Sequence, residues 1–372
     1  MSHLLFVNHT RQLHGSEQVL LHVLRAARAD GHRITVVLPS HVPSGGLDQE
    51  VEPLADRILY LPYRPVGISL LRSLLVLLYN IYAWRRLVRY IRRKGVEAVY
   101  SNTSVTVLGL WAARSTHLPH SWHYHEPVDA HFGWHPSLAL PYRHGMSYAA
   151  NRPVFISQRQ LREWAEALSF PLGGEVIYNP VRTLEPVAPV PHEGLVVGFL
   201  GCFEPRKNLP ILLRAVEALR YEGHDIRLLL CGAQSDAEIL ALRAMTGLDE
   251  SLLTIERHTN RVESFFSRID VFVLPSLSET MPLVVTEALQ SGVPVVMTTE
   301  SGLGEILTEG RDLLTFRPDN LAELLQQLRK CLDSDFRRQL AESGRLRLIE
   351  ADYTARFYRA IQLHFQSSTR HD

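Results

Sequence analysis

The chain has few cysteines, very few lysines and no long uninterrupted apolar run. Its cysteines, Cys202, Cys231 and Cys331, show no paired spacing, which argues against a disulfide framework and favours a cytoplasmic location. Met1 leads directly into a strand-like run at 4–8 without a basic region, so we do not expect a signal peptide. Arg72 and Asn80 interrupt the most apolar stretch, whereas a transmembrane helix needs roughly 20 apolar residues, so we do not expect a membrane span.

Metal-binding patterns are also scarce. The one Asp-x-Asp, Asp333 to Asp335, lies in a polar break before a predicted helix, and we interpret it as a helix start. No cysteine accompanies a group of histidines that a zinc site could otherwise use, namely His120, His123, His125, His131 and His135. We therefore expect neither a divalent metal nor another cofactor.

Positive and negative charge are unevenly distributed along the 372 residues, although the formal net charge is zero. Residues 1–180 carry 18 Lys and Arg against 12 Asp and Glu, and residues 181–372 carry 21 against 27. A basic half beside an acidic half suggests that the basic half meets an anionic partner. Chance combined with complementarity between domains is the alternative.

Hydrophobic periodicity predicts two α/β domains. A strand at 4–8, a helix from Ser16 to about Asp30 with Ser16 as its cap, and a strand at 34–38 form a βαβ unit, which predicts a parallel doubly wound sheet. Four prolines between 180 and 191 indicate a linker, after which the strand–helix rhythm restarts at 195. We predict an N-terminal domain at 1–180, a linker at 181–193, a second domain at 194–350, and a C-terminal helix at 351–372 that packs back on the first domain. Two Rossmann-like domains, each with a parallel sheet, would face a central cleft, and ligands bind at strand carboxyl ends in such folds.

Residues 68–94 form an apolar run followed by a basic one. Six basic residues follow the apolar part within ten positions: Arg85, Arg86, Arg89, Arg92, Arg93 and Lys94. A basic amphipathic helix of this kind can lie on an anionic bilayer, or it can simply pack on the sheet with a solvated end.

The stretch 275–296 places Glu279 in a loop after a strand and Glu287 on the following helix. A helix start offers free N–H groups and a positive dipole end, which suit a diphosphate, here near Thr280, Met281, Pro282 and Leu283. Carboxylates accept hydrogen bonds from hydroxyls, so Glu279 and Glu287 could hold the sugar and the ribose of a nucleotide sugar. Alternatively, Glu279 caps the helix and Glu287 lies on the surface. Arg206 and Lys207, just after the first strand of the second domain, could offset the phosphate charge.

This stretch resembles the E-x7-E signature of glycosyltransferase family 4, a GT-B family. The segments HGSE (14–17), FISQRQ (155–160), VIYNPV (176–181) and GFLGCFEPRKN (198–208) resemble further motifs of the family in the same order. The resemblance implies a GT-B fold, a nucleotide-sugar donor and retention of anomeric configuration. It assigns Lys207 to the diphosphate, His125 and Glu279 to the donor sugar, and Gly15 and Ser16 to donor binding.

Two positions depart from the family pattern. Cys202 stands where the family usually has arginine, and a thiol cannot replace a guanidinium on phosphate, although Arg206 could compensate. His14 stands where a glycine is expected, while Gly15 still permits close approach of backbone to ligand.

The resemblance predicts a metal-independent retaining hexosyltransferase that moves a sugar from a UDP- or GDP-sugar to a carbohydrate or lipid-linked acceptor. It would act in bacterial surface polysaccharide or glycolipid synthesis. Peripheral membrane contact through 68–94 would place the protein at the inner face of the membrane. We do not expect a nucleic acid partner. The alternatives are a non-catalytic nucleotide-sugar-binding protein and a nucleotide-sugar epimerase.

Overall fold

The computed structural model describes residues 1–64, 70–128, 148–169, 173–184, 186–259 and 261–369, and no side chains over 70–77. His131, His135 and the start of the segment 68–94 therefore lie outside the described residues. The chain divides into two compact units, residues 1–180 with 354–372, and residues 181–353. Each unit is an α/β domain with its own sheet.

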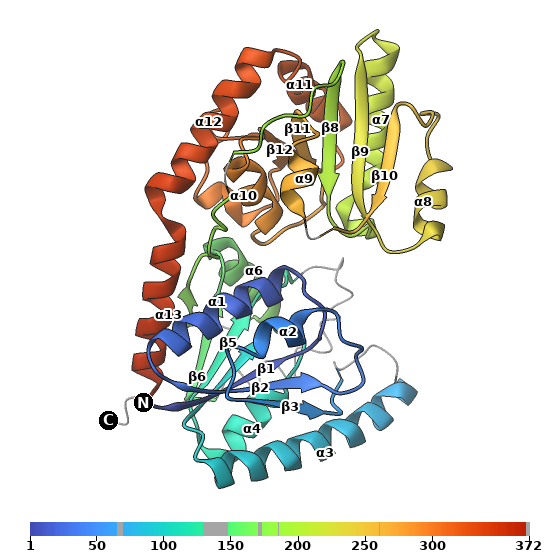
Figure 1. The fold of residues 1–372 in the computed structure, drawn as a ribbon. Coiled ribbons are helices and arrows are strands. Elements are labelled where there is room, and N and C mark those ends of the chain that lie inside the picture. Colours follow the sequence, from blue (N-terminus) through green and yellow to red (C-terminus); the bar gives the residue numbers. More distant parts are fainter. Residues whose placement is uncertain (65–69, 129–147, 170–172, 185, 260, 370–372) are drawn as a thin grey trace. The chain divides into compact units, whose positions relative to one another are not determined.

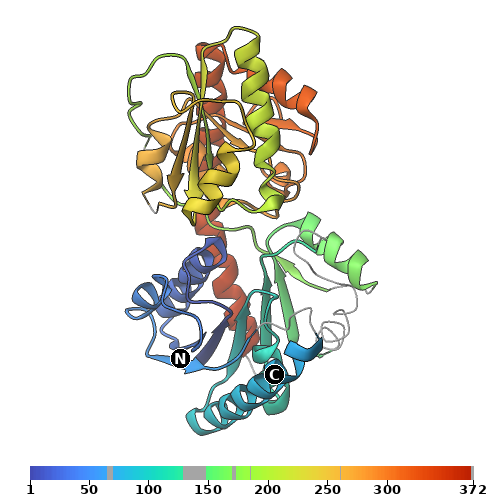
Figure 2. The ribbon, with the colours of Figure 1, turned by 90° about the vertical axis from the view of Figure 1, so that its right-hand side faces the viewer.

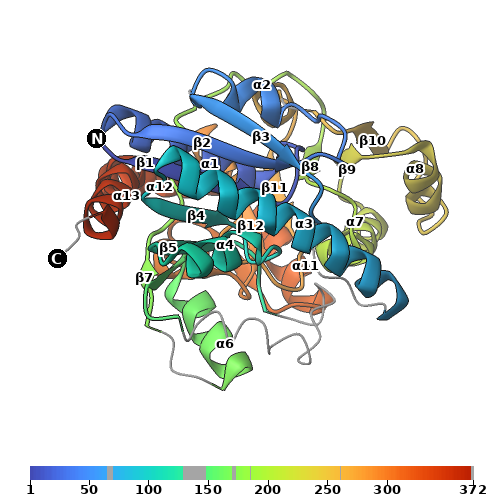
Figure 3. The same cartoon turned by 90° about the horizontal axis from the view of Figure 1, so that it is seen from below.

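Unit 1 contains a parallel sheet with the strand order β3-β2-β1-β4-β5-β6-β7. Helix α1 lies on one face of this sheet, and α3 and α4 lie together on the other (Figure 1, Figure 3). The strands are β1 His3–Asn8, β2 Arg33–Pro39, β3 Arg57–Leu61, β4 Ala98–Asn102, β5 His120–Tyr124, β6 Asn151–Phe155 and β7 Glu175–Val176. The helices are α1 Gly15–Ala29, α2 Leu47–Val51, α3 Leu70–Lys94, α4 Leu108–Thr116, α6 Gln158–Leu168 and α13 Tyr353–Thr369.

Unit 2 repeats this plan with the order β10-β9-β8-β11-β12-β13, again parallel throughout. Its helices cover both sides of the sheet (Figure 2), with α7 packed beside α11 and α10 beside α12. The strands are β8 Leu195–Leu200, β9 Ile226–Ala233, β10 Leu253–Arg257, β11 Val271–Leu274, β12 Val295–Thr298 and β13 Leu314–Phe316. The helices are α7 Leu209–Tyr221, α8 Asp236–Arg243, α9 Val262–Phe266, α10 Leu283–Gln290, α11 Leu321–Lys330 and α12 Ser334–Ala351, with short 3₁₀ turns η3 Pro205–Lys207 and η4 Gly302–Glu305.

The central strands of both sheets, β1 and β8, are buried along their whole length. All six residues of β1 and all six of β8 are buried, because helices cover both faces of a parallel sheet. The strand order reverses between β1 and β4 in unit 1 and between β8 and β11 in unit 2. The loops that leave these strands diverge to opposite faces, and that is where doubly wound sheets bind ligands.

The proline-rich segment belongs to unit 2 in the structure. Val187 N donates to Ser291 O at 3.2 Å and Val190 N donates to Ser267 O at 2.7 Å. These backbone bonds tie the segment to the ends of α10 and α9, so it is not an independent tether.

The C-terminal helix α13 packs on unit 1, whose core its side chains Phe357, Ile361 and Phe365 enter. His364 on α13 bonds Ser121 of β5 and Glu175 of β7. The sequence placed the boundary of this segment at 350/351, and the structure has it at 353/354.

Two expected helix starts have different outcomes. Asp333 is the cap of α12, and its side chain accepts hydrogen bonds from Asp335 N and Phe336 N, which confirms the interpretation of the Asp-x-Asp as a helix start. Ser16 is not the cap of α1: the helix begins at Gly15 with His14 in the capping position. Ser16 Oγ instead donates a hydrogen bond to Glu17 Oε2 at 3.0 Å. The Ser16 hydroxyl therefore bonds the neighbouring carboxylate and does not cap a backbone N–H.

Candidate functional site

Three predicted charged residues meet at the switch point of unit 2. Arg206 and Lys207 lie on η3, which follows β8, and Glu279 lies in the loop that follows β11. Because β8 and β11 are paired neighbours, the carboxyl ends of both strands deliver their loops to the same edge of the sheet.

Glu279 is the centre of this group. Its carboxylate is 9% exposed and its Oε1 atom forms an ion pair with Lys207 Nζ and a longer one of 3.5 Å with Arg206. Arg206 also binds Glu204 Oε2 at 2.8 Å. Burial alone would raise the pKa of Glu279, but the charges of Lys207 and Arg206 outweigh it and hold the pKa below its usual value. The carboxylate is therefore ionised, and both cations have a defined position.

Backbone hydrogen bonds fix the loop that carries Glu279. Leu277 N donates to Arg206 O at 2.8 Å, which joins the loop to η3. Glu279 N donates to Glu300 O at 2.9 Å, and Gly302 N donates to Thr280 O at 2.8 Å, which joins it to the start of η4. The loop is thus bound on both sides, and the position of Glu279 is set by main-chain contacts rather than by its side chain alone.

Helix α10 starts directly after this loop. Pro282 occupies the capping position and no side chain caps the helix, while Met281 is buried and Leu283 is half-buried. The first N–H groups of a helix have no intrahelical partner, and they carry the positive end of its dipole. The stretch 280–283, in which only Pro282 lacks an N–H, therefore lies at the edge where Lys207 and Arg206 lie.

Glu287 is buried on α10, so the alternative of a surface position is wrong. Burial raises the pKa of its carboxyl, which Arg182 partly opposes at 3.8 Å. Arg182 also pairs with Glu263 at 3.1 Å. Sequence reasoning missed Arg182, because it lies about one hundred positions before its partner in a segment that had been interpreted as a linker.

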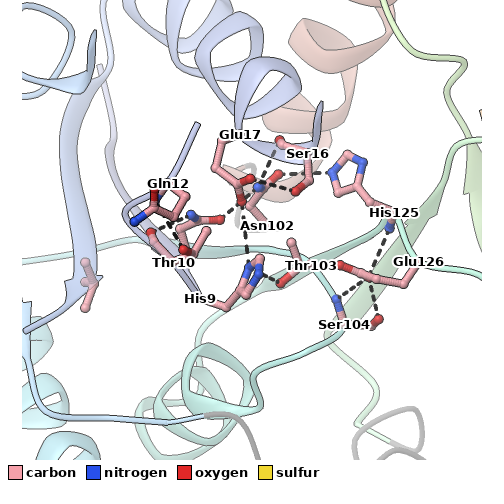
Figure 4. A network of polar contacts seen from close by, with 12 residues as sticks. His9, Thr10, Gln12, Ser16, Glu17, Asn102, Thr103, Ser104, His125 and Glu126 are labelled. Carbon is pink, nitrogen blue, oxygen red and sulfur yellow. Dashed lines mark hydrogen bonds and ion pairs between the residues drawn. The ribbon is translucent and has the colours of Figure 1, made fainter. Parts of the chain in front are cut away.

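The predicted residues of unit 1 lie at its own switch point (Figure 4). Gly15 and Ser16 begin α1 after β1, and His125 follows β5. They are connected through Asn102 at the end of β4: its Nδ2 donates to Ser16 O at 3.2 Å, and its Oδ1 lies 3.1 Å from His125 Nε2. Sequence reasoning missed Asn102, whose only signal was a polar residue at the end of a buried strand.

His125 is a neutral imidazole. Burial and the neighbouring His9 lower its pKa to about 3. The His125 ring packs against the His123 ring, with centroids 4.1 Å apart. The backbone N of His125 lies 3.3 Å from Glu126 Oε2. Glu126 Oε2 also accepts from Ser104 N at 3.1 Å and Ser104 Oγ at 2.6 Å, so the acidic neighbour fixes the loop beneath the histidine.

Glu17 is completely buried under this network. Burial raises the pKa of its carboxyl to about 7, against the opposing hydrogen bonds of Ser16 and Asn8. Its Oε1 atom lies 3.7 Å from His9 Nδ1 and has no hydrogen-bond partner among the described residues. Glu17 shares a helix face with Leu20 and Leu24, and that spacing could have predicted a buried acid.

No group of three or more His, Cys, Asp or Glu side chains among the described residues could hold a metal ion. Within the same residues, no helix is long and apolar enough to cross a bilayer.

Known proteins are similar to this chain in fold and in part of its sequence. A sequence model described as Glycosyltransferase Family 4 matches residues 13–184, and one described as Glycosyl transferases group 1 matches residues 194–334. Two parallel Rossmann-like domains with these matches define a glycosyltransferase of the GT-B fold. The chain belongs to the family 4 type of these proteins.

Curated relatives match part of the chain. A D-inositol 3-phosphate glycosyltransferase of Corynebacterium urealyticum is 32% identical over 165 residues, 41% of this chain and 38% of the relative. A protein of the same name from Corynebacterium kroppenstedtii is 30% identical over 199 residues, 49% of this chain and 40% of the relative. The chain thus spans well under half of the length of these relatives.

Solved structures match the whole chain at low identity. Anabaena HepE in complex with UDP-glucose is 17% identical, with a TM-score of 0.79 and coverage of 99% of this chain and 100% of HepE. WaaG, a glycosyltransferase involved in lipopolysaccharide biosynthesis, is 15% identical, with a TM-score of 0.70 and coverage of 97% and 99%. These likenesses support the GT-B fold.

Proposed function

We propose that the chain transfers a sugar from a nucleoside-diphosphate sugar to a hydroxyl acceptor, with retention of configuration and without a metal. The observation that carries the proposal is the meeting of Lys207, Arg206 and Glu279 with the uncapped start of α10 at the switch point of unit 2. Two cations and main-chain donors suit a diphosphate, and an ionised carboxylate beside them suits sugar hydroxyls.

The leaving diphosphate is the group that needs stabilisation in such a transfer. Lys207, Arg206 and main-chain N–H groups of the stretch 280–283, in which Pro282 has none, would meet the charge that develops as the sugar–phosphate bond breaks. The acceptor hydroxyl attacks from the same face and gives its proton to the departing phosphate. The buried Glu287 would hold the ribose, while Gly15, Ser16 and His125 keep the donor-binding roles that the family resemblance assigns to them.

We propose a UDP-sugar as the first candidate donor and a GDP-sugar as the second. HepE, a protein of the same fold, was solved in complex with UDP-glucose, which is the reason for placing UDP-sugars before GDP-sugars. The acceptor is proposed as an anionic carbohydrate or lipid-linked sugar, because residues 1–180 are basic and the curated relatives are named for a phosphorylated inositol. Surface polysaccharide or glycolipid synthesis at the inner face of the bacterial membrane would provide such an acceptor.

A thermal-shift screen with UDP-, GDP- and ADP-sugars tests donor binding, since a ligand that binds the folded state raises the melting temperature. The donor that gives the largest shift is then used in a transfer assay with and without a chelator. Turnover that survives the chelator supports the proposal, and turnover that the chelator abolishes contradicts it. Product formed from donor alone would indicate an epimerase, and binding without any turnover would indicate a non-catalytic protein.

A further inference from the structure

A chain of amide side chains connects a backbone carbonyl near β1 to the imidazole of His125 (Figure 4). Asn8 Nδ2 donates to Thr10 O at 3.0 Å, and Asn8 Oδ1 accepts from Asn102 Nδ2 at 2.9 Å. Asn102 Oδ1 then lies 3.1 Å from His125 Nε2. Asn8 and Asn102 are fully buried, so water does not compete for these groups.

Carbonyl oxygens fix the direction of every bond in this chain. Thr10 O can only accept, so the atom of Asn8 that faces it must be the nitrogen, and Asn8 Oδ1 must face Asn102. Ser16 O, 3.2 Å from Asn102, can likewise only accept, so the same atom of Asn102 must be its nitrogen. The two backbone carbonyls give the same orientation. Turning over the amide of Asn8 would place its oxygen against Thr10 O, and turning over that of Asn102 would place its oxygen against Ser16 O.

The remaining atom, Asn102 Oδ1, can only accept a hydrogen bond. His125 Nε2 must therefore carry a proton and donate it. A neutral imidazole has one N–H, so Nδ1 is then the acceptor nitrogen of the ring. Any hydroxyl that bonds Nδ1 must therefore donate to it.

We propose that Asn102, oriented by Asn8 and Ser16 O, is a positioning residue that fixes His125 as the single Nε2–H tautomer and so defines it as a hydrogen-bond acceptor. The consequence for a donor sugar rests on the proposed function, whereas the tautomer itself does not. Asn102 acts through His125.

Nitrogen-15 NMR of histidine-labelled protein reads the tautomer directly, because protonated and unprotonated ring nitrogens have widely separated shifts. His125→Gln assigns the signals by removing them. A free neutral imidazole is a mixture of both tautomers and gives averaged shifts. We expect His125 to show the limiting shifts of one tautomer, with a proton on Nε2 that exchanges slowly with solvent; averaged shifts or a proton on Nδ1 would overturn the proposal.

Asn102→Leu removes the acceptor and should move both ring-nitrogen shifts toward each other, with faster exchange of the Nε2 proton. His120, whose ring bonds Ser101 and Asn151, is the internal control and should not change. Should Asn102→Leu fail to fold, Asn102→Ser, whose side chain is too short to reach the ring, takes its place.

An Asn102→Leu spectrum identical to that of the original protein would refute the role of Asn102. Donor binding is measured separately by thermal shift. A protein that shows the single tautomer but binds no nucleotide sugar would contradict the proposed function and leave the tautomer assignment standing.

Discussion

At the scale of single residues, the Lys207–Glu279 ion pair defines how the unit 2 site meets a nucleotide sugar. Lys207 already has an anionic partner in the structure, so a diphosphate must share or replace Glu279. The two residues should therefore have opposite effects on a ligand that has phosphates but no sugar, and this separates their proposed roles.

Lys207→Ala should weaken binding of both UDP and the UDP-sugar and lower turnover by about 10²–10³, the usual cost of losing one group that stabilises developing charge. Glu279→Gln should bind UDP at least as tightly as the original protein, because Lys207 is released, yet lose the additional affinity that the sugar provides. Calorimetry with UDP and with the UDP-sugar measures both. Equal losses for both ligands in Glu279→Gln would contradict a sugar-binding role.

The buried acid Glu17 should make stability depend on pH. Because burial raises the pKa of Glu17 from its ordinary value of 4.5 to about 7, the folded state holds a proton that the unfolded chain releases between these two values. The original protein should then lose stability as pH rises from about 4.5 to 7, by at most about 3 kcal/mol, and remain level above.

Glu17→Gln removes this titration. Relative to the original protein, the variant should gain stability between pH 5 and pH 7.5, as measured by melting temperatures at both values. Glu166→Gln, which changes an exposed glutamate of the same unit, is the control and should give no such gain. If the difference in melting temperature between Glu17→Gln and the original protein were the same at both pH values, Glu17 would be ionised in the folded state.

At the scale of elements, Gly344 allows α12 to approach α10 closely. A Cβ atom there would lie 2.4 Å from Asp312 O and 2.8 Å from Leu289 Cδ2. Alanine is usually favoured over glycine within a helix by about 1 kcal/mol, but here overpacking should reverse the sign and destabilise unit 2 by about 1–3 kcal/mol. Gly304→Ala, which meets no atom within 4 Å, is the matched control in thermal unfolding. A stabilised Gly344→Ala would contradict the close packing.

One buried histidine of helix α13 makes two polar contacts with the strands of unit 1. His364 Nε2 lies 2.6 Å from Ser121 Oγ, and its Nδ1 lies 3.0 Å from Glu175 Oε2. His364→Ala leaves the buried Ser121 hydroxyl without this partner and should cost about 1–3 kcal/mol. Leu363→Ala, at a site 58% exposed on the same helix, should change stability by less than about 0.5 kcal/mol. Similar melting temperatures for both variants would show that the contacts do not hold the helix.

At the scale of the whole molecule, the separation of charge between the two halves suggests a surface for anionic membranes. In the described part of α3, Leu78, Tyr79 and Tyr82 are exposed, and basic side chains follow on the same helix. We therefore propose peripheral contact of this helix with an anionic bilayer.

Liposome co-sedimentation tests the contact. Binding to anionic vesicles should fall as salt rises, and changing Arg85, Arg86 and Arg89 to glutamine should weaken it by about 1 kcal/mol for each charge. The control removes the same number of exposed charges from unit 2, at Arg311, Arg317 and Arg338, and should have little effect. Equal binding by both triple variants would contradict the proposal.

Sequence periodicity was sufficient for the two-domain α/β architecture. Buried parallel strands read as continuous apolar runs, and helices read as apolar stripes, because each pattern reflects which faces are covered. The positions of Arg206, Lys207 and Glu279 after strand ends followed from the same periodicity. Their meeting at one edge follows from parallel strands having their carboxyl ends together.

Only the tertiary structure decided which side chains are buried and which are paired. Arg182 meets Glu287, Asn102 joins Ser16 to His125, and Glu17 lies under the loop after β1. These contacts join residues far apart in the chain, and their electrostatics depend on burial, which no local pattern of sequence contains. The order of residues along the sequence therefore determines where loops leave the sheets. Packing in three dimensions determines the charge and the hydrogen bonds of the side chains that these loops carry.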